Sequence, residues 1–162
     1  MSSFLSEALS LCNLAAVGIF GIVLSAAFCE IEWTRCHKLL LVGSTILMLA
    51  LQGVVSLRWG TGLARYLYPF ITHLPLWLLL AVMTRHALWP LVSVLTAYLC
   101  CQLRRWAALL VIALFPAGGT ALQNATELIV TLPILLVMIR WIAPSVRALS
   151  RSPLLLQLQF GM

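Results

Sequence analysis

The sequence predicts an all-α fold, a polytopic transmembrane helical bundle with about six membrane segments. Two features of the composition predict it, since 63% of the 162 residues are hydrophobic and only 9% are charged. A soluble domain has roughly a quarter charged residues, so this chain could not cover a water-facing surface. The third feature is a repeated pattern of long apolar runs closed by one or two cations and an aromatic residue. We therefore expect a multi-pass protein of the cell membrane.

Residues 4–28 form the first predicted segment, and residues 39–57 form the second. No Lys or Arg precedes the first apolar run, which favours a retained helix over a cleaved signal peptide. Gly21 and Ser25 place two small residues one turn apart, a spacing that permits close helix packing. The loop between the segments contains Cys, Glu and His, but not at a spacing typical of a metal site. We interpret this loop as a solvated turn with Trp33 at the lipid headgroups.

Residues 66–83, the third predicted segment, contain Pro69, His73 and Pro75. Each proline removes a backbone donor and frees a carbonyl, so we expect this helix to bend. An ionisable group in a membrane segment is costly and is a functional candidate by default. His73 is therefore a candidate signal or packing site. The simpler interpretation, which we favour, is that His73 hydrogen-bonds a freed carbonyl at the interface.

Residues 88–106 form the fourth predicted segment, which ends at Arg104, Arg105 and Trp106. Two cations and an aromatic residue after an apolar run are typical of a membrane edge, so we expect these three residues to be membrane-edge anchors. The next stretch, residues 107–120, is interrupted by a proline and two glycines. It predicts either a short or re-entrant segment, or a kinked helix that continues into the last segment.

Residues 121–142, the last predicted segment, contain the one cluster of strong polar groups within a predicted span. Its members are Gln123, Asn124, Thr126 and Glu127. Spacings of three and four place Gln123, Thr126 and Glu127 on one helix face. That face predicts either the lining of a polar pocket inside the bundle or a wet position at the outer interface, and the sequence favours neither. Together with His73, we take Gln123, Asn124 and Glu127 as the candidate signal or packing site.

The last segment ends in a basic region, in which we interpret Arg140 and Trp141 as further membrane-edge anchors. The sequence predicts one domain, a transmembrane helical bundle over residues 1–151. Residues 152–162 predict the start of a truncated further apolar segment or a short tail. With six segments, most cations fall on the side that holds both ends, so the positive-inside rule predicts that both termini are cytoplasmic.

Catalytic and nucleotide-binding motifs are missing from the sequence. The chain has no Asp, one Lys, no phosphate-binding loop, and no Gly-x-Ser-x-Gly or His-Glu-x-x-His motif. Its five cysteines are an odd set that lies mostly in apolar runs, which favours reduced, buried thiols over a disulfide framework. We therefore expect no enzymatic activity, no catalytic residue, no metal and no cofactor. In so apolar a chain, the net charge of +6 predicts headgroup contacts and no nucleic-acid binding.

Three short stretches of the chain resemble a known family. They read YLYP and THLP within residues 66–75, AYLCCQLRRW over residues 97–106, and TLP and APSV within residues 131–146. This pattern resembles the membrane-embedded N-terminal module of sensor histidine kinases of the GHKL ATPase group from Firmicutes, over about residues 66–151. In that family a cytoplasmic dimerisation and ATP-binding region follows the bundle. Because this sequence contains no such region, we do not expect phosphotransfer from it.

The resemblance implies a sensory module of the bacterial inner membrane, as in two-component signal transduction, that lacks its catalytic kinase domain. The expected partners are membrane lipids and either a second copy of the chain or a cytoplasmic kinase or other signalling protein. The ligand is not indicated. The alternative is a small six-helix substrate-binding subunit or permease component of an uptake transporter, which the chain length and the polar last segment also suit. A purely structural membrane subunit is a third interpretation.

Overall fold

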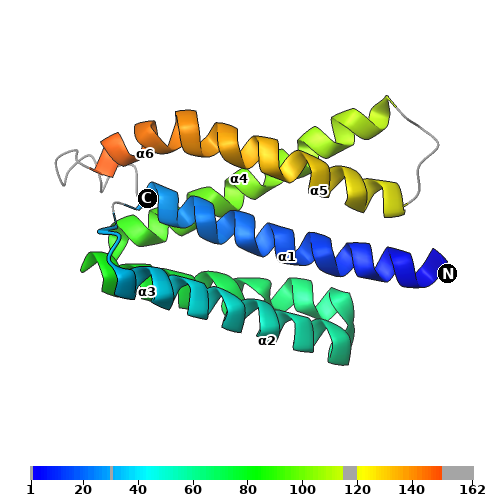
Figure 1. Ribbon diagram of the computed structural model, residues 1–162, viewed down its shortest axis with the longest axis horizontal. Coiled ribbons are helices and arrows are strands. Elements are labelled where there is room, and N and C mark those ends of the chain that lie inside the picture. The colour runs from blue at the N-terminus through cyan, green and yellow to red at the C-terminus, as the bar shows by residue number, and fades with distance from the viewer. Residues whose placement is uncertain (1, 30, 115–119, 151–162) are drawn as a thin grey trace.

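All the secondary structure of the described residues is helical. The computed structural model describes residues 2–29, 31–114 and 120–150, and Figure 1 shows its helices lying alongside one another in an elongated bundle. In chain order the elements are α1 (Ser2–Phe28), α2 (Arg35–Tyr68), η1 (Pro69–His73), α3 (Leu74–Thr84), α4 (Leu88–Ala113), α5 (Thr120–Val137), η2 (Met138–Ile142) and α6 (Ala143–Ser150). The two η elements are π-helical turns. The prediction of an all-α fold is confirmed for this part of the chain.

Five helical spans in the described part of the chain are long and apolar enough to cross a membrane, where about six segments were predicted. They run over Ser6–Phe28, Arg35–Gly60, Gly62–Thr84, Leu88–Ala113 and Ala121–Ser150. The difference arises after Trp106, because α4 continues to Ala113 without interruption. The predicted end of the fourth segment at Trp106 was therefore wrong, and so was a new segment beginning at residue 107. Residues 107–113 are Ala, Leu, Val and Ile with no helix breaker, so they extend the helix. Residues 115–119 of the predicted re-entrant stretch lie outside the described residues.

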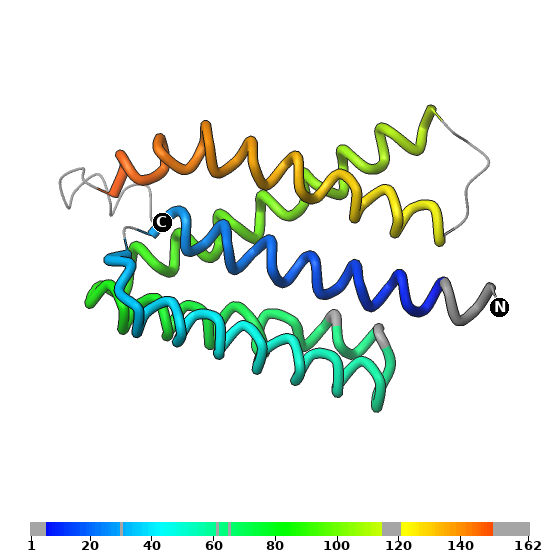
Figure 2. Tube along the Cα trace, viewed as in Figure 1, coloured from blue at the N-terminus to red at the C-terminus, as the bar shows by residue number. Residues whose placement is uncertain are grey.

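An odd number of crossings puts the two ends of the described chain at opposite ends of the bundle. Figure 2 shows α1 starting at one end and the last helix finishing at the other. The expectation that both termini are cytoplasmic counted six crossings, whereas the described residues contain five helices of membrane-crossing length. The predicted tail, residues 152–162, lies outside the described residues.

Local backbone features set the limits of the crossing helices. The side-chain oxygen of Thr34 accepts a hydrogen bond of 3.2 Å from the backbone N–H of His37, which satisfies a free donor in the first turn of α2. Gly60 has a φ of +85°, a conformation that favours glycine, and there α2 folds back on itself (Figure 1). Arg85 is in the left-handed conformation where α3 ends. We refer to residues 35–84, which contain the second and third crossing helices, as the α2–α3 hairpin.

Each π-helical turn ends two residues before a proline. Pro75 follows η1, and Pro144 follows η2. In an α-helix the proline ring clashes with the carbonyl four residues earlier and cannot donate a hydrogen bond to it. A wider π turn at this point moves that carbonyl away from the ring. The distortion predicted around Pro69 and Pro75 therefore takes the form of a π turn.

The central helix of the bundle is α1, which lies between the α4–α5 pair and the α2–α3 hairpin (Figure 1). Its most extensive contacts are with α4 and α5. Phe20, Leu24 and Phe28 of α1 are fully buried in a core shared with α4 and η2. A Cβ atom at Gly18 would come within 3.0 Å of Leu49 Cδ2, so this glycine lets the hairpin approach α1 closely.

Candidate functional site

A buried ion pair joins α4 to α5. Arg104 Nη2 lies 3.0 Å from Glu127 Oε2, and the two residues are only 3% and 6% exposed. Taking two charges out of water carries a large desolvation penalty, which their mutual attraction offsets only when further hydrogen bonds satisfy both groups. The residues around the pair supply those hydrogen bonds.

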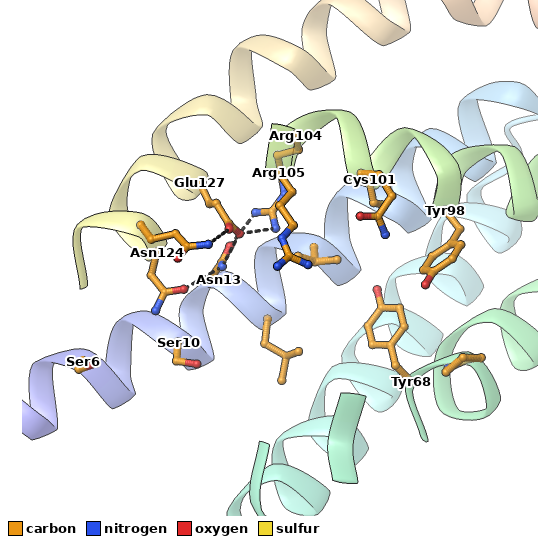
Figure 3. Close-up of a pocket in the computed structure, with 15 residues that line it drawn as sticks. Ser6, Ser10, Asn13, Tyr68, Tyr98, Cys101, Arg104, Arg105, Asn124 and Glu127 are labelled. Carbon is orange, nitrogen blue, oxygen red and sulfur yellow. Dashed lines mark hydrogen bonds and ion pairs between the residues drawn. The ribbon is translucent and has the colours of Figure 1, made fainter. Parts of the chain in front are cut away.

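Asn13 of α1 hydrogen-bonds to both members of the ion pair. Its amide nitrogen donates to Glu127 Oε2 at 2.7 Å, and its carbonyl oxygen accepts from Arg104 Nη1 at 2.6 Å. The same amide nitrogen lies 3.1 Å from Asn124 Oδ1. A side-chain amide can do this because it carries both donors and an acceptor. Three helices, α1, α4 and α5, therefore meet at one point (Figure 3).

One face of α5 supplies the remaining hydrogen bonds. Gln123 Nε2 donates to Glu127 Oε1 at 3.3 Å. Thr131 Oγ1 accepts from Arg104 Nη1 at 3.1 Å and donates to the backbone carbonyl of Glu127 at 2.6 Å. A spacing of four places these residues on the same face, and the structure turns that face into the bundle. We use the name polar cluster for Asn13, Arg104, Gln123, Asn124, Glu127 and Thr131.

A pocket of about 600 Å³ lies beside the polar cluster (Figure 3). Besides members of the cluster, its polar lining includes Ser6, Ser10, Gln102 and Arg105, and its less polar lining includes Leu14, Val17, Tyr68 and Tyr98. Pockets that bind small molecules typically have volumes of roughly 300–1,000 Å³ and combine an apolar wall with a few polar groups. Two arginines against one glutamate give the lining a positive formal charge. The pocket therefore has the size and character of a site for a small polar molecule.

Four of the five predicted membrane-edge anchors are exposed, namely Arg105, Trp106, Arg140 and Trp141. The fifth, Arg104, was wrongly assigned to the membrane edge. Its guanidinium group points into the bundle towards Glu127, and nine residues of α4 follow it. Adjacent residues on a helix point about 100° apart, so one of two consecutive arginines can be exposed while the other is buried.

His73 lies outside the polar cluster, behind two tyrosines that line the pocket. Its ring meets those of Tyr68 and Tyr98 edge-on, with centroid distances of 5.0 Å and 4.8 Å. Its Nε2 atom is buried and has no hydrogen-bond partner among the described residues, so the carbonyl expected from the sequence is not found at this nitrogen. Of the four predicted site residues, the structure brings Gln123, Asn124 and Glu127 together and keeps His73 apart.

Sequence analysis missed the contribution of Asn13 and the inward orientation of Arg104. Two signals could have indicated them. Asn13 is a strongly polar amide within the apolar run of the first helix. A carboxylate within a membrane segment, here Glu127, usually has an opposite charge as its partner. No such signal marks Tyr68 and Tyr98, because tyrosines are common in membrane helices near the interface.

The site can hold a small charged or polar molecule by hydrogen bonds and ion pairing. In the part of the chain that the structure describes, no three His, Cys, Asp or Glu side chains gather as a metal site would require. Comparisons of this chain with family models, with curated proteins and with solved structures found no match. Its function is therefore argued from the geometry of the site.

Proposed function

We propose that this chain is a sensory module of a bacterial cell membrane, in which the pocket binds a signal molecule and α5 transmits the effect to the cytoplasmic side. One observation carries the proposal: four members of the polar cluster and the basic end lie on the same span, Ala121–Ser150. Gln123 and Glu127 lie near the start of that span, and Arg140 and Arg147 lie near its end. A ligand that displaces Glu127 therefore acts on the helix that ends in the basic region.

The distribution of cations supports an outward-facing pocket. The end of the bundle that holds Ser150 also holds the loops after α1 and α3 (Figure 1). Five cations lie towards that end, namely Arg35, Lys38, Arg85, Arg140 and Arg147. Four lie towards the opposite end, namely Arg58, Arg65, Arg104 and Arg105, and Arg104 is paired with Glu127. The positive-inside rule assigns the more basic end to the cytoplasm. The pocket is lined by residues 6–17 of α1 and 123–127 of α5, which belong to the end of the bundle opposite Ser150, so it lies towards the outer side.

Signal transmission requires two arrangements of α5 that the ligand stabilises to different extents. Asn13 and Arg104 hold the start of α5 against α1 and α4. A ligand that competes for these hydrogen bonds would favour a second packing of α5. The π turn η2 lies between the cluster and the basic end, and such turns are frequent at functional sites. The resemblance to membrane modules of GHKL-type sensor kinases agrees with this function, in which any phosphotransfer belongs to a separate kinase region.

The test measures whether filling the pocket changes the local motion of the basic end of the last span. Ser145 is exposed on α6, and a spin label on Ser145→Cys would report local motion there in a nanodisc, once the exposed Cys12 and Cys36 are changed to Ser. Ser10→Trp fills the pocket, and we expect it to change the electron paramagnetic resonance spectrum of the label. The matched control is Leu110→Trp on the exposed face of α4, which should leave the spectrum unchanged. Identical spectra for the labelled protein with an unchanged pocket, its Ser10→Trp variant and its Leu110→Trp variant would contradict the proposal.

A transport function is the second candidate, and one observation favours it. A smaller cavity of about 10 Å³ shares Tyr68, Tyr98 and Cys101 with the pocket and reaches inwards to Ser25 and Thr72. A transporter exposes its site to each side in turn, whereas a sensor pocket opens to one side. In vesicles of known orientation, a membrane-impermeant thiol reagent should modify Ser10→Cys from the outer side alone. Modification from both sides would favour the transporter.

A further inference from the structure

Most acceptor oxygens of the polar cluster already accept a hydrogen bond. Both carboxylate oxygens of Glu127 accept hydrogen bonds, from Arg104, Asn13 and Gln123. The side-chain oxygens of Asn13, Asn124 and Thr131 each accept one as well. The remaining polar lining consists of arginine, amide and hydroxyl groups, which can all donate, and its amide and hydroxyl oxygens can also accept. The charged donors of the lining are the two arginines.

Two arginines of the pocket lining have N–H donors without a hydrogen-bond partner among the described residues. Arg104 Nε is buried and has no hydrogen-bond partner among the described residues. Arg105 lines the same pocket, and no hydrogen bond or ion pair joins it to the described part of the chain. The single carboxylate in the lining, Glu127, neutralises Arg104 and leaves the charge of Arg105 uncompensated. A guanidinium group binds carboxylates and phosphates through paired hydrogen bonds.

The side of the pocket away from the polar cluster is less polar. Leu14, Val17 and the rings of Tyr68 and Tyr98 line it, so a ligand that fills the pocket needs an apolar part as well as a charged one. In Figure 3 the two tyrosines lie on the opposite side of the pocket from Asn124 and Glu127. This separation fits an elongated ligand with a charge at one end.

We propose that the pocket binds a small amphipathic anion, whose carboxylate or phosphate pairs with Arg105 and whose apolar part lies against Tyr68 and Tyr98. This inference rests on the proposed sensory function, because it names the class of signal that the pocket would take. Arg104 lies in the same lining as Arg105, so the bound anion would also compete with Glu127 for Arg104. The anion could be a free amphiphile or the headgroup of an anionic phospholipid, since both present the same chemistry to Arg105.

The test compares three probes with the same apolar chain and different head groups. The full chain in phosphatidylcholine nanodiscs is titrated with octanoate, octylamine and octanol, and empty nanodiscs correct for partition into lipid. We expect octanoate to bind at least about tenfold more tightly than the other two probes, because a charge-assisted hydrogen bond to a guanidinium group is stronger than a hydrogen bond between neutral groups. Arg105→Gln should remove this preference, whereas Arg140→Gln, a change of an exposed cation on η2, should keep it.

Each other outcome has a defined meaning. Equal binding of octanoate and octylamine, or of octanoate to Arg105→Gln, would overturn the anion assignment while leaving the sensory function in place. Binding of none of the probes would overturn it as well. Loss of octanoate binding in phosphatidylglycerol nanodiscs, with no such loss for octanol, would identify the phospholipid headgroup as the anion and support the proposal. Octanoate binding without any change at a Ser145→Cys spin label would support the ligand class and contradict the sensory function.

Discussion

The two sides of α1 differ in how their buried polar groups are satisfied. On the side of α4 and α5, the polar cluster gives each charged group an opposite charge and several hydrogen bonds. On the side of the α2–α3 hairpin, polar atoms are buried without a hydrogen-bond partner among the described residues. They are Gln52 Nε2, Ser56 Oγ, Thr72 Oγ1 and His73 Nε2.

The difference indicates that polar contacts specify the interface of α1 with α4 and α5, whereas packing specifies its interface with the α2–α3 hairpin. In the polar cluster, Arg104 Nε is the one buried side-chain atom without a hydrogen-bond partner among the described residues. An unpaired polar group inside a membrane protein is costly, whereas a network in which nearly every polar group has a partner fixes one arrangement of its helices. The contacts of α1 agree with this, because they are extensive with α4 and α5 and few with α2. We expect the hairpin to separate from α1 more readily than α4 and α5 do.

The largest effect should come from breaking the ion pair. Arg104→Met leaves the Glu127 carboxylate buried without its partner, so the free energy of unfolding should fall by about 3–5 kcal/mol. The measurement is an unfolding titration in bicelles. The double variant with Glu127→Met as well should recover much of the loss, because it removes both charges. Arg105→Met is the control, and its effect should stay within about 0.5 kcal/mol because Arg105 is exposed. A double variant no more stable than Arg104→Met would show that packing and not charge pairing holds this interface.

The same substitution on the two sides of α1 should have opposite effects. Gln52→Leu removes an unpaired buried amide from the hairpin interface, so it should raise the free energy of unfolding by about 1–2 kcal/mol. Gln123→Leu removes a hydrogen bond to Glu127, so it should lower that free energy by about 0.5–1.5 kcal/mol. The unfolding titration described above measures both. If Gln52→Leu also destabilises the protein, the hairpin interface satisfies its polar atoms with water.

The smallest effect concerns the reactivity of a thiol and leaves stability unchanged. Cys29 follows α1 and belongs to the core that Met48 and Leu76 of the hairpin complete. Burial raises the pKa of the Cys29 thiol from 9.0 to about 11. The thiolate is the reactive form, so below pH 9 the raised pKa alone lowers the reactive fraction by about a hundredfold relative to an ordinary thiol.

Variants that retain a single cysteine allow this reactivity to be measured with a maleimide. Cys36 is exposed and should react at pH 8, whereas Cys29 should react far more slowly and accelerate as the pH rises towards 11. Similar rates for Cys29 and Cys36 at pH 8 would mean that water reaches the hairpin side of α1. That result would weaken the contrast between the two interfaces.

Sequence patterns predicted the helices better than the connections between them. The first three crossing helices and the start of the fourth lie close to their predicted ranges, because apolar length and flanking cations depend on local sequence alone. The fourth helix was ended too early at Trp106, because charged residues after an apolar run, here Arg104 and Arg105, are usually at the membrane edge. That rule fails when a carboxylate from another helix makes the interior favourable for an arginine. The difference between the predicted six segments and the five membrane-length helices of the described residues followed from it.

The candidate site was predicted in part for the same reason. The face that holds Gln123 and Glu127 could be recognised from spacing within one helix, but Asn13 and Arg104 are 114 and 23 residues away from Glu127 in the sequence. The sequence by itself determined that the chain forms apolar helices of membrane-crossing length, since burial of apolar side chains and internal backbone hydrogen bonding are properties of each segment. Only the tertiary structure decided which polar groups meet, because the partner of a buried charge is set by how three separate helices pack.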